Sequence, residues 1–399
     1  MGTRISHSIR LATVLGLTLT ALAPSSQAQE IINKGAVTGL KVAQGKHHNQ
    51  IDFTHAKLLT LPKAPHSAAV QAEQDLISNL VNRFQSSAAT EGGQVAGFEG
   101  DGVTNAVELG SPSISFEAQE GLEVEPQQFG TSNHPFTTAR ADLSVNTNTY
   151  YPYRASGKLF FNIDGSTYVC SASLIKRGVV VTAAHCVSEY GTRRFYTDFR
   201  FVPGYRNGVA PYRVWTASTI WVPSGYLHGA AGQCAATAPG VICKDDVAVI
   251  ELAPQANPTY PGTSTGWYGY GWNRWGFTSS GLTHITQTGY PVALDNGRYM
   301  QRNDSQGFIG SSSLMGNTII GSLMTGGSSG GPWLNNFGNA PTLYGISFGS
   351  FSTSNVVVGV TSWGYTDPTI KQQGASPFTS TNIVSLVSAA CASSDARCR

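Results

Sequence analysis

The sequence predicts an all-β protein, built as a barrel or a sandwich. From Tyr150 onward about a dozen short runs rich in Val, Ile, Thr, Phe and Trp recur between Gly, Pro, Asn and Asp, such as GVVVTAA, RVWTASTIWV and NVVVGVTSWG. Little helical periodicity separates these runs, which is typical of strands joined by turns. Only 12% of the residues are charged and 41% are apolar, which suits an extracellular β-rich chain with a sizeable core. One helix is expected near the end, around TSTNIVSLVSAA.

The N-terminus is predicted to be a secretory signal peptide, residues 1–28. Arg4 and Arg10 precede an apolar run from Leu11 to Leu22, and small residues stand at Ser26 and Ala28. The run is too short for a stable membrane span, so we expect a secreted, extracellular protein with no membrane contact in its mature form. An N-terminal core helix is the alternative. A formal net charge of +2 gives no reason to expect a nucleic acid partner.

The six cysteines are expected to form disulfides. Six cysteines allow 15 pairings, of which the sequential one is the simplest. A secreted chain favours disulfides over metal sites, and no CxxC or HxxxH spacing indicates zinc. We therefore expect no metal and no cofactor. The expected pairs are Cys170–Cys186, Cys234–Cys243 and Cys391–Cys398.

Residues 29–140 and 141–399 differ in charge. The first range holds 7 Lys and Arg against 12 Asp and Glu, and the second holds 16 against 11, which gives net charges of −5 and +5. An acidic segment ahead of a basic domain is predicted to be a removable propeptide that covers the domain. The alternative is a solvated acidic linker. The boundary is open between about 125 and 147, with Arg140 as one candidate.

A helix is predicted within the acidic segment. The stretch HSAAVQAEQDLISNLVNRF has Ser67 as a candidate N-cap. Its apolar residues recur at helical spacing and predict a buried stripe. The stripe consists of Val70, Ile77, Leu80, Val81 and Phe84.

The motif VTAAHC places a histidine directly after an apolar strand. If Cys186 pairs with Cys170, the disulfide tethers the chain next to His185. Closing such a loop of about 15 residues contributes on the order of 3 kcal/mol. A general base must lie within hydrogen-bond reach of its proton, so a fixed imidazole has a chemical use. An ordinary strand-end histidine is the alternative.

The motif DDVAVIEL places two acids at the entrance of a second apolar strand. Asp246 is the candidate acceptor for the histidine Nδ1–H, where a carboxylate sets the tautomer of the ring. Asp245 competes for this role. Because successive strand residues face opposite ways, only one of the two can face the histidine.

The motif TGGSSGGPW offers a nucleophile, Ser329, in a glycine-rich turn. Glycines permit unusual backbone dihedrals and the close approach of a substrate. The N–H groups of Gly327 and Ser329 are candidates for an oxyanion hole. Taken alone, such a run is equally typical of a surface loop.

The three motifs occur in the order His, Asp, Ser, and in this order they resemble the chymotrypsin-fold serine endopeptidases. The stretches TNTYYPYRA, FVPGYRNG, WVPSGY and QTGYP are similar to the bacterial glutamyl-endopeptidase branch. The resemblance covers residues 145–385 and implies two six-stranded antiparallel β-barrels within a protease domain, residues 141–399. It implies that His185 is the general base, Asp246 its orienting acid and Ser329 the nucleophile.

The resemblance also implies where substrates bind. Ser362, Trp363 and Gly364 match the strand that pairs with the substrate backbone and walls the specificity pocket. The expected partners are protein or peptide substrates and the chain's own propeptide, and the expected state is a monomer. Ser328 stands where many animal members carry an aspartate, so activation is expected through removal of a steric block.

Two positions of the specificity pocket depart from the charge-recognising members. Thr361 stands where the glutamyl-specific enzymes carry a histidine, and Leu323 stands where Arg- and Lys-cutting members are acidic. We therefore expect a preference for uncharged side chains before the cleaved bond. Specificity for Glu is the alternative.

Parts of these motifs also fit two other classes of protein. The run GSSGG fits the nucleophile elbow of lipases, but that arrangement needs a histidine after the serine, and no histidine follows Ser329. A non-catalytic binding module on a protease fold is the other reading, because fold alone does not decide activity. Such modules usually lack one of the three catalytic residues, and here all three are present.

Overall fold

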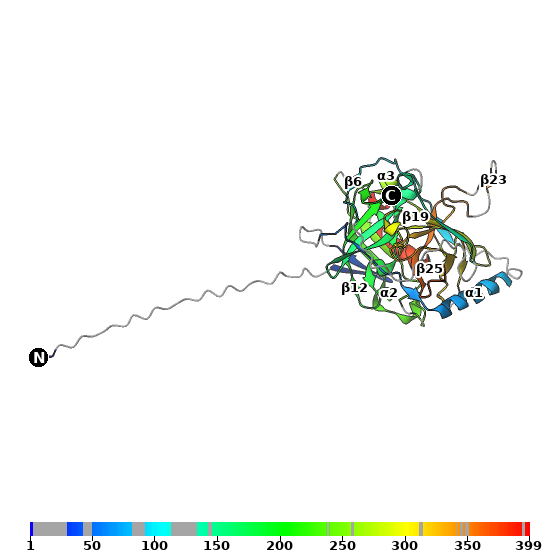
Figure 1. The fold of residues 1–399 in the computed structure, drawn as a ribbon, viewed down its shortest axis with the longest axis horizontal. Coiled ribbons are helices and arrows are strands. Elements are labelled where there is room, and N and C mark those ends of the chain that lie inside the picture. The colour runs from blue at the N-terminus through cyan, green and yellow to red at the C-terminus, as the bar shows by residue number, and fades with distance from the viewer. Residues whose placement is uncertain are drawn as a thin grey trace.

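The structure is a computed structural model in which strands fill a rounded body and helix α1 (His66–Val81) lies on its outside (Figure 1). It describes residues 1–2, 30–42, 50–81, 92–112, 134–142 and 146–399. The last range has gaps at 237, 239, 257–258, 311–313, 341, 344–345, 348–350 and 393–395. Apart from its first two residues, the predicted signal peptide lies outside this part of the chain. No helix within the described residues is long and apolar enough to cross a membrane.

The first barrel consists of six antiparallel strands between residues 156 and 252. The last strand pairs back onto the first, with Ile250 opposite Ile220, and this pairing closes the ring. The run VVVT is buried along its whole length, as its unbroken apolar sequence predicts. In spatial order the strands are β15 (Trp215–Pro223), β13 (Thr197–Pro203), β8 (Ser156–Ile163), β9 (Ser166–Lys176), β10 (Val179–Thr182) and β16 (Ala248–Leu252).

The second barrel repeats this arrangement between residues 282 and 377. It closes where Trp333 lies opposite Gly359. The prediction of two six-stranded antiparallel barrels is confirmed. The strands in spatial order are β21 (Pro332–Asn335), β18 (Leu282–Gly289), β19 (Gln301–Ile309), β20 (Thr318–Gly321), β25 (Gln372–Pro377) and β24 (Val356–Tyr365).

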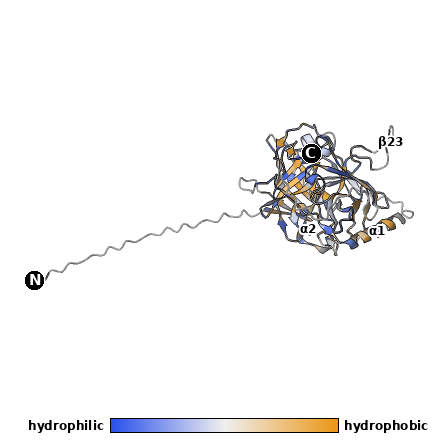
Figure 2. Cartoon of the chain, in the orientation of Figure 1, coloured by the Kyte–Doolittle hydropathy of each residue, from blue (hydrophilic) through white to orange (hydrophobic). Residues whose placement is uncertain are grey.

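Residues of high hydropathy lie in the strands of the body, as the colouring of Figure 2 shows, and many of them form its buried core. The expected C-terminal helix is α4 (Ile383–Ala390), which packs Ile383 and Leu386 into the core of the first barrel. Asn382 caps this helix: its side-chain oxygen accepts the Ile383 N–H, and its amide donates to the Lys244 carbonyl at 2.9 Å. The cap therefore ties α4 to the chain just before Asp245 and Asp246.

Short elements connect the barrels and their strands. The strands are β11 (Ser188–Glu189), β12 (Arg194–Phe195), β14 (Val209–Ala210), β17 (Gly269–Trp272), β22 (Thr342–Leu343) and β23 (Ile346–Ser347). The helices are α2 (Ser224–His228) and α3 (Gly262–Thr265), with 3-10 turns at Thr147–Thr149, Tyr153–Ala155, Ala184–Cys186, Ala231–Gln233, Asp295–Gly297 and Ala396–Cys398.

The described part of the acidic segment adds strands to both barrels. Two of its strands extend β15 and β9 of the first barrel, and two extend β19 and β24 of the second. Two more pair with β17 and with β14. The contacts are thus largely backbone pairings. The strands are β1 (Glu30–Lys34), β2 (Val37–Lys41), β3 (Lys57–Leu58), β4 (Lys63–Ala64), β5 (Gly93–Val95), β6 (Val107–Glu108) and β7 (Phe136–Arg140).

Helix α1 forms where the sequence predicts a helix, but it buries a different face. Val70 and Ile77 of the predicted stripe are 46% and 56% exposed, while Ala68 and Ala72 are buried against the second barrel. Small side chains let the helix approach the barrel closely, and Leu76 packs beside the alanines against the same core cluster. The stripe side chains at 80, 81 and 84 lie outside the described residues.

The structure contains three disulfides, which join the cysteines in sequential pairs. They are Cys170–Cys186, Cys234–Cys243 and Cys391–Cys398. The first joins β9 to the turn that follows β10. It therefore lies directly beside His185.

Candidate active site

His185 and Asp246 meet because their strands are neighbours. Strands β10 and β16 are antiparallel, with Thr182 opposite Ala248. The residue that follows the end of β10 and the residue that precedes β16 therefore emerge at the same end of the first barrel. His185 lies there in the Ala184–Cys186 turn, and Asp246 lies two residues before β16.

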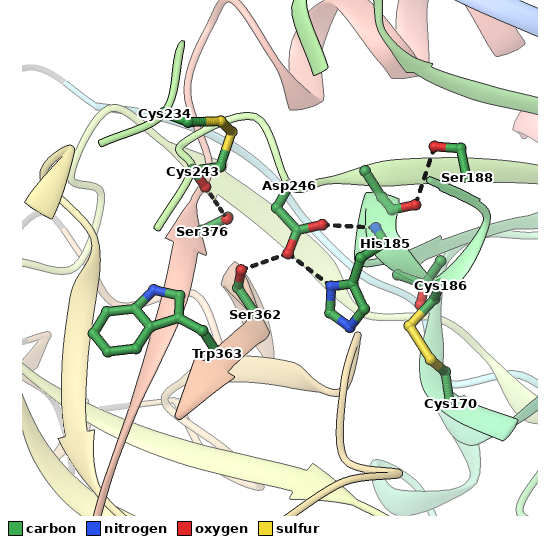
Figure 3. A network of polar contacts seen from close by, with 12 residues as sticks. Cys170, His185, Cys186, Ser188, Cys234, Cys243, Asp246, Ser362, Trp363 and Ser376 are labelled. Carbon is green, nitrogen blue, oxygen red and sulfur yellow. Dashed lines mark hydrogen bonds and ion pairs between the residues drawn. A yellow bond between two sulfur atoms is a disulfide. The ribbon is translucent and has the colours of Figure 1, made fainter. Parts of the chain in front are cut away.

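The Asp246 carboxylate holds His185 at two points (Figure 3). One oxygen accepts the His185 backbone N–H at 2.8 Å, and the other lies 2.8 Å from His185 Nδ1. A ring nitrogen that faces a carboxylate carries the proton. This places the hydrogen on Nδ1 and leaves the lone pair on Nε2, the tautomer that a general base requires.

Ser362 completes the surroundings of Asp246. Its hydroxyl donates to Asp246 Oδ2 at 2.5 Å, as Figure 3 shows. The carboxylate is fully buried and accepts three hydrogen bonds, which compensate for its removal from water. The resemblance predicts that the strand of Ser362 pairs with a substrate, and the side chain of Ser362 contacts the acid.

Asp245, the competing acid, lies elsewhere. The nearest side-chain oxygen of Asp245 is 3.7 Å from the position that a Cβ on Gly225 would occupy, which places the carboxyl beside helix α2. Burial raises the pKa of Asp245 to about 6. Two adjacent acids therefore have different surroundings, and only Asp246 contacts the histidine.

Ser329 reaches this site from the second barrel, in the loop before β21. Its carbonyl accepts the Ser171 N–H at 2.8 Å, and Ser171 follows Cys170 of the disulfide to Cys186. Within the described residues, neither Ser329 Oγ nor His185 Nε2 has a hydrogen-bond partner, although both atoms are buried. The histidine–aspartate bond is thus formed, and the serine–histidine bond is not.

The two N–H groups that are candidates for an oxyanion hole belong to Gly327 and Ser329, in the loop before β21. Gly327 has a φ of 90°, and a Cβ there would lie 2.5 Å from the Tyr290 carbonyl, so the position requires glycine. Its carbonyl accepts a hydrogen bond from Ser171 Oγ at 2.8 Å. Among the described residues no acceptor pairs with the N–H of Gly327 or of Ser329.

Ser171 is a site residue that the sequence analysis missed. Its hydroxyl donates to the Gly327 carbonyl and accepts the Tyr290 N–H at 2.9 Å. It thus joins the loop before Ser329 to the first barrel. The only signal in the sequence is its place directly after Cys170.

One group of candidate metal ligands occurs within the described residues, formed by His185, Cys170 and Cys186. Both sulfur atoms belong to one disulfide. Metal ligation by cysteine requires thiolates, so this group is not a metal centre.

The trypsin family model matches residues 144–384, which is more than half of the chain. The chain belongs to the trypsin family. Glutamyl endopeptidase of Bacillus licheniformis is 29% identical over 150 residues, which are 37% of this chain and 39% of that protein. An extracellular metalloprotease of Bacillus subtilis is 29% identical over 182 residues, 44% of this chain and 48% of that protein. The chain thus spans less than half the length of these curated relatives.

Solved structures of proteases are also similar to this trypsin-family chain. The protease Anisep from Arthrobacter nicotinovorans has a TM-score of 0.46 and 28% identity, and the match covers 60% of this chain and 96% of that one. A Glu endopeptidase in complex with MPD has a TM-score of 0.43 and 20% identity, with 64% and 97% covered.

Leu323 and Trp363, two of the residues expected around the specificity pocket of this trypsin-family chain, each contact a different part of the structure. Leu323 is half-buried, and its N–H donates to the Thr138 hydroxyl of β7 at 3.3 Å. Trp363 is buried and donates from its indole to Asn317 at 2.8 Å. A Cβ on Gly374 would lie 2.0 Å from this indole, so Trp363 packs directly on the backbone of β25.

Thr361 belongs to a buried network of uncharged groups. Its hydroxyl accepts from the Gln287 amide at 2.8 Å and from the Trp333 indole at 2.9 Å, and it donates to the Gly331 carbonyl at 3.3 Å. The Gln287 amide also donates to Gln373, whose own amide donates to the Met324 carbonyl at 2.7 Å. The Thr361 hydroxyl, the Gln287 and Gln373 amides and the Trp333 indole therefore all donate to acceptors within the protein.

Proposed function

We propose that the chain is the precursor of a secreted serine endopeptidase that acts through His185, Asp246 and Ser329. The observation that carries this proposal is the pair of bonds from Asp246 to His185, which leave Nε2 as an acceptor beside the loop of Ser329. The bacterial glutamyl endopeptidase among its relatives supports the same class of reaction.

The proposed reaction is acyl transfer. His185 Nε2 takes the proton of the Ser329 hydroxyl as the oxygen attacks the peptide carbonyl. The N–H groups of Gly327 and Ser329 stabilise the oxyanion, and His185 then protonates the leaving amine. Water hydrolyses the acyl-enzyme by the same route. Asp246 stabilises the imidazolium that forms, and Ser362 and the His185 backbone keep its carboxylate in place.

We propose that residues 29–140 form a propeptide, following a signal peptide that ends at residue 28. The strands that this segment adds to both barrels support this view over a solvated acidic linker. Among the described residues, the ion pair between Arg140 and Asp295 has the opposite polarity to the net charges of the two ranges. The contacts that support the proposal are therefore the backbone pairings.

The site at which the propeptide is cut stays open between residues 125 and 147. Arg140 is the last residue of β7 and pairs with Gln301 of β19. Cleavage directly after Arg140 therefore requires the end of β7 to separate from β19, because a protease acts on an accessible, extended chain.

We propose that the enzyme prefers an uncharged residue before the cleaved bond. The network around Thr361 contains no charged group, and its hydroxyl has no hydrogen left for a substrate carboxylate. A carboxylate buried against such a wall would lose its hydration without an equivalent partner. Specificity for Glu, which the name of the relative glutamyl endopeptidase indicates for that protein, is the alternative.

Labelling with a fluorophosphonate, read by intact mass, tests the proposed function. The processed wild-type enzyme should take up one adduct, and the Ser329→Ala variant should take up none. The same spectrum gives the mature N-terminus. A processed, folded wild type that takes up no adduct would contradict the proposal and favour a non-catalytic binding module.

A further inference from the structure

The segment from Lys57 to Ala64 crosses the site from one barrel to the other. Its first strand, β3, pairs in parallel with β9, where Leu58 lies opposite Val169. Its second strand, β4, pairs in parallel with β24, where Lys63 lies opposite Gly364. One short peptide thus adds a strand to both barrels on either side of Ser329.

Backbone hydrogen bonds fix this segment at both ends. On the first barrel, the Leu59 N–H donates to the Val169 carbonyl at 3.3 Å. On the second, the Gly364 N–H donates to the Pro62 carbonyl at 2.9 Å. Gly364 belongs to the stretch that is expected to pair with a substrate, so the segment uses a donor that a substrate would need.

Between these ends the segment touches the loop that precedes Ser329. A Cβ on Gly326 would lie 3.1 Å from the Leu59 carbonyl oxygen and 3.4 Å from the Leu61 nitrogen. A Cβ on Gly327 would lie 3.0 Å from Leu58 Cδ2. Leu58 therefore covers the loop whose N–H groups are proposed to form the oxyanion hole.

Leu61 fills the space between this loop and β24. Its Cδ2 lies 2.9 Å from the position of a Cβ on Gly364, and its nitrogen lies beside Gly326. The residue is only 3% exposed. An apolar side chain that is removed from water at this point stabilises the covered form of the site.

We propose that Lys57–Ala64 is an inhibitory strand that lies in the substrate cleft in the direction opposite to a cleavable substrate, with Leu61 taking the place of the side chain before the cleaved bond. This inference rests on the proposed function, because the direction of a substrate follows from the roles of His185 and Ser329.

The direction of a substrate in the cleft follows from the fate of the leaving amine. His185 protonates that amine, so the C-terminal half of a substrate lies on the side of His185 and the Cys170–Cys186 disulfide, next to β9. The acyl half then lies along β24. A substrate runs from β24 to β9, whereas Lys57–Ala64 runs from β9 to β24.

A reversed backbone is not cleaved, because orientation is part of the catalysis. Attack requires a carbonyl aligned with Ser329 Oγ, with its amine directed to His185. In the reversed strand the amine of each peptide bond is directed to β24 instead. Strand addition supplies affinity without presenting a bond in the reactive orientation. The segment is therefore an inhibitor of the enzyme and not its substrate.

The rate of fluorophosphonate labelling of Ser329 in the unprocessed chain tests the role of Leu61. Leu61→Asp should raise this rate by about tenfold or more, since it opposes burial of the side chain. Val70→Asp is the matched control, because Val70 lies on the exposed face of α1 within the same proposed propeptide. It should leave the rate unchanged. A Leu61→Asp chain that is labelled as slowly as wild type, while the processed enzyme is labelled rapidly, would overturn the proposal.

Two synthetic peptides test the direction on processed wild-type enzyme, without any variant. The peptide HAKLLTLPKAPH, residues 55–66, should inhibit and be recovered intact. The same residues in reverse order, HPAKPLTLLKAH, should be cut between Leu and Thr. Cleavage of the forward peptide between Leu58 and Pro62 would overturn the proposal. Processed enzyme that takes up no fluorophosphonate would instead contradict the proposed function itself.

Discussion

The carboxylate of Asp246 binds His185 both at its backbone N–H and at its ring Nδ1, each at 2.8 Å. These two hydrogen bonds let one buried carboxylate fix both the position of His185 and the orientation of its imidazole. Ser362 supplies the third hydrogen bond to the acid. The acid thus orients the histidine, while within the described residues His185 Nε2 and Ser329 Oγ have no hydrogen-bond partner.

Replacing Asp246 should abolish most activity while leaving the fold intact. In Asp246→Asn the amide nitrogen competes for the position facing Nδ1 and favours the wrong tautomer, so kcat should fall on the order of 10⁴-fold. Asp245→Asn is the matched control and should retain activity. The comparison of kcat on a peptide substrate checks both. An equal loss in the two variants would contradict the assignment of Asp246.

Asp245 should make stability fall as the pH rises. Burial raises its pKa from 3.8 to about 6, so the folded state disfavours the ionised form. Stability is therefore lost as the pH rises from about 4 to 6, by up to about 3 kcal/mol for a shift of this size. Asp245→Asn should unfold at a higher temperature than its parent at pH 8 and at the same temperature at pH 3. Both chains should carry Ser329→Ala, so that self-digestion does not intervene.

The Cys170–Cys186 disulfide should support the position of His185 as well as the fold. Its sequence separation of 16 corresponds to about 3 kcal/mol of stabilisation in the entropic description. Replacing both cysteines by alanine should lower the unfolding temperature and also the rate of fluorophosphonate labelling. The same change at Cys391 and Cys398 should lower stability but not the labelling rate. An unchanged labelling rate in the first variant would show that the tether does not position the histidine.

The positions of His185, Asp246 and Ser329 could be predicted because each follows or precedes a short apolar strand in a recognisable motif. The choice of Asp246 over Asp245 depends on which residue faces inward before β16. Alternation along the strand says that only one of them does, but not which one. Ser171 has no motif of its own. Its role arises from the approach of two barrels, which no local pattern encodes.

The inhibitory strand Lys57–Ala64 could not be predicted for a related reason. The stretch KLLTLPKA has no period of two, and β3 and β4 are two residues each, so their pairing is determined by β9 and β24, more than 100 and about 300 residues away. For α1, helical spacing correctly predicts a helix. It does not reveal that Ala68 and Ala72 are buried against the second barrel, while Val70 and Ile77 stay exposed.

The buried network around Thr361 should determine which side chain the enzyme accepts before the cleaved bond. Gln287, Gln373 and Thr361 are neutral and do not titrate, and their donors are used within the protein. Processed enzyme should therefore cleave peptides with Leu before the scissile bond with kcat/KM at least about tenfold above those with Glu, because an unpaired buried carboxylate costs a few kcal/mol. The ratio should stay constant between pH 6 and 9, since both substrate forms and the wall keep their charge in this range. A peptide library with each residue at the cleaved position, read at both pH values, measures it. Strict cleavage after Glu, or after Arg and Lys, would show that the uncharged network around Thr361 does not determine substrate preference.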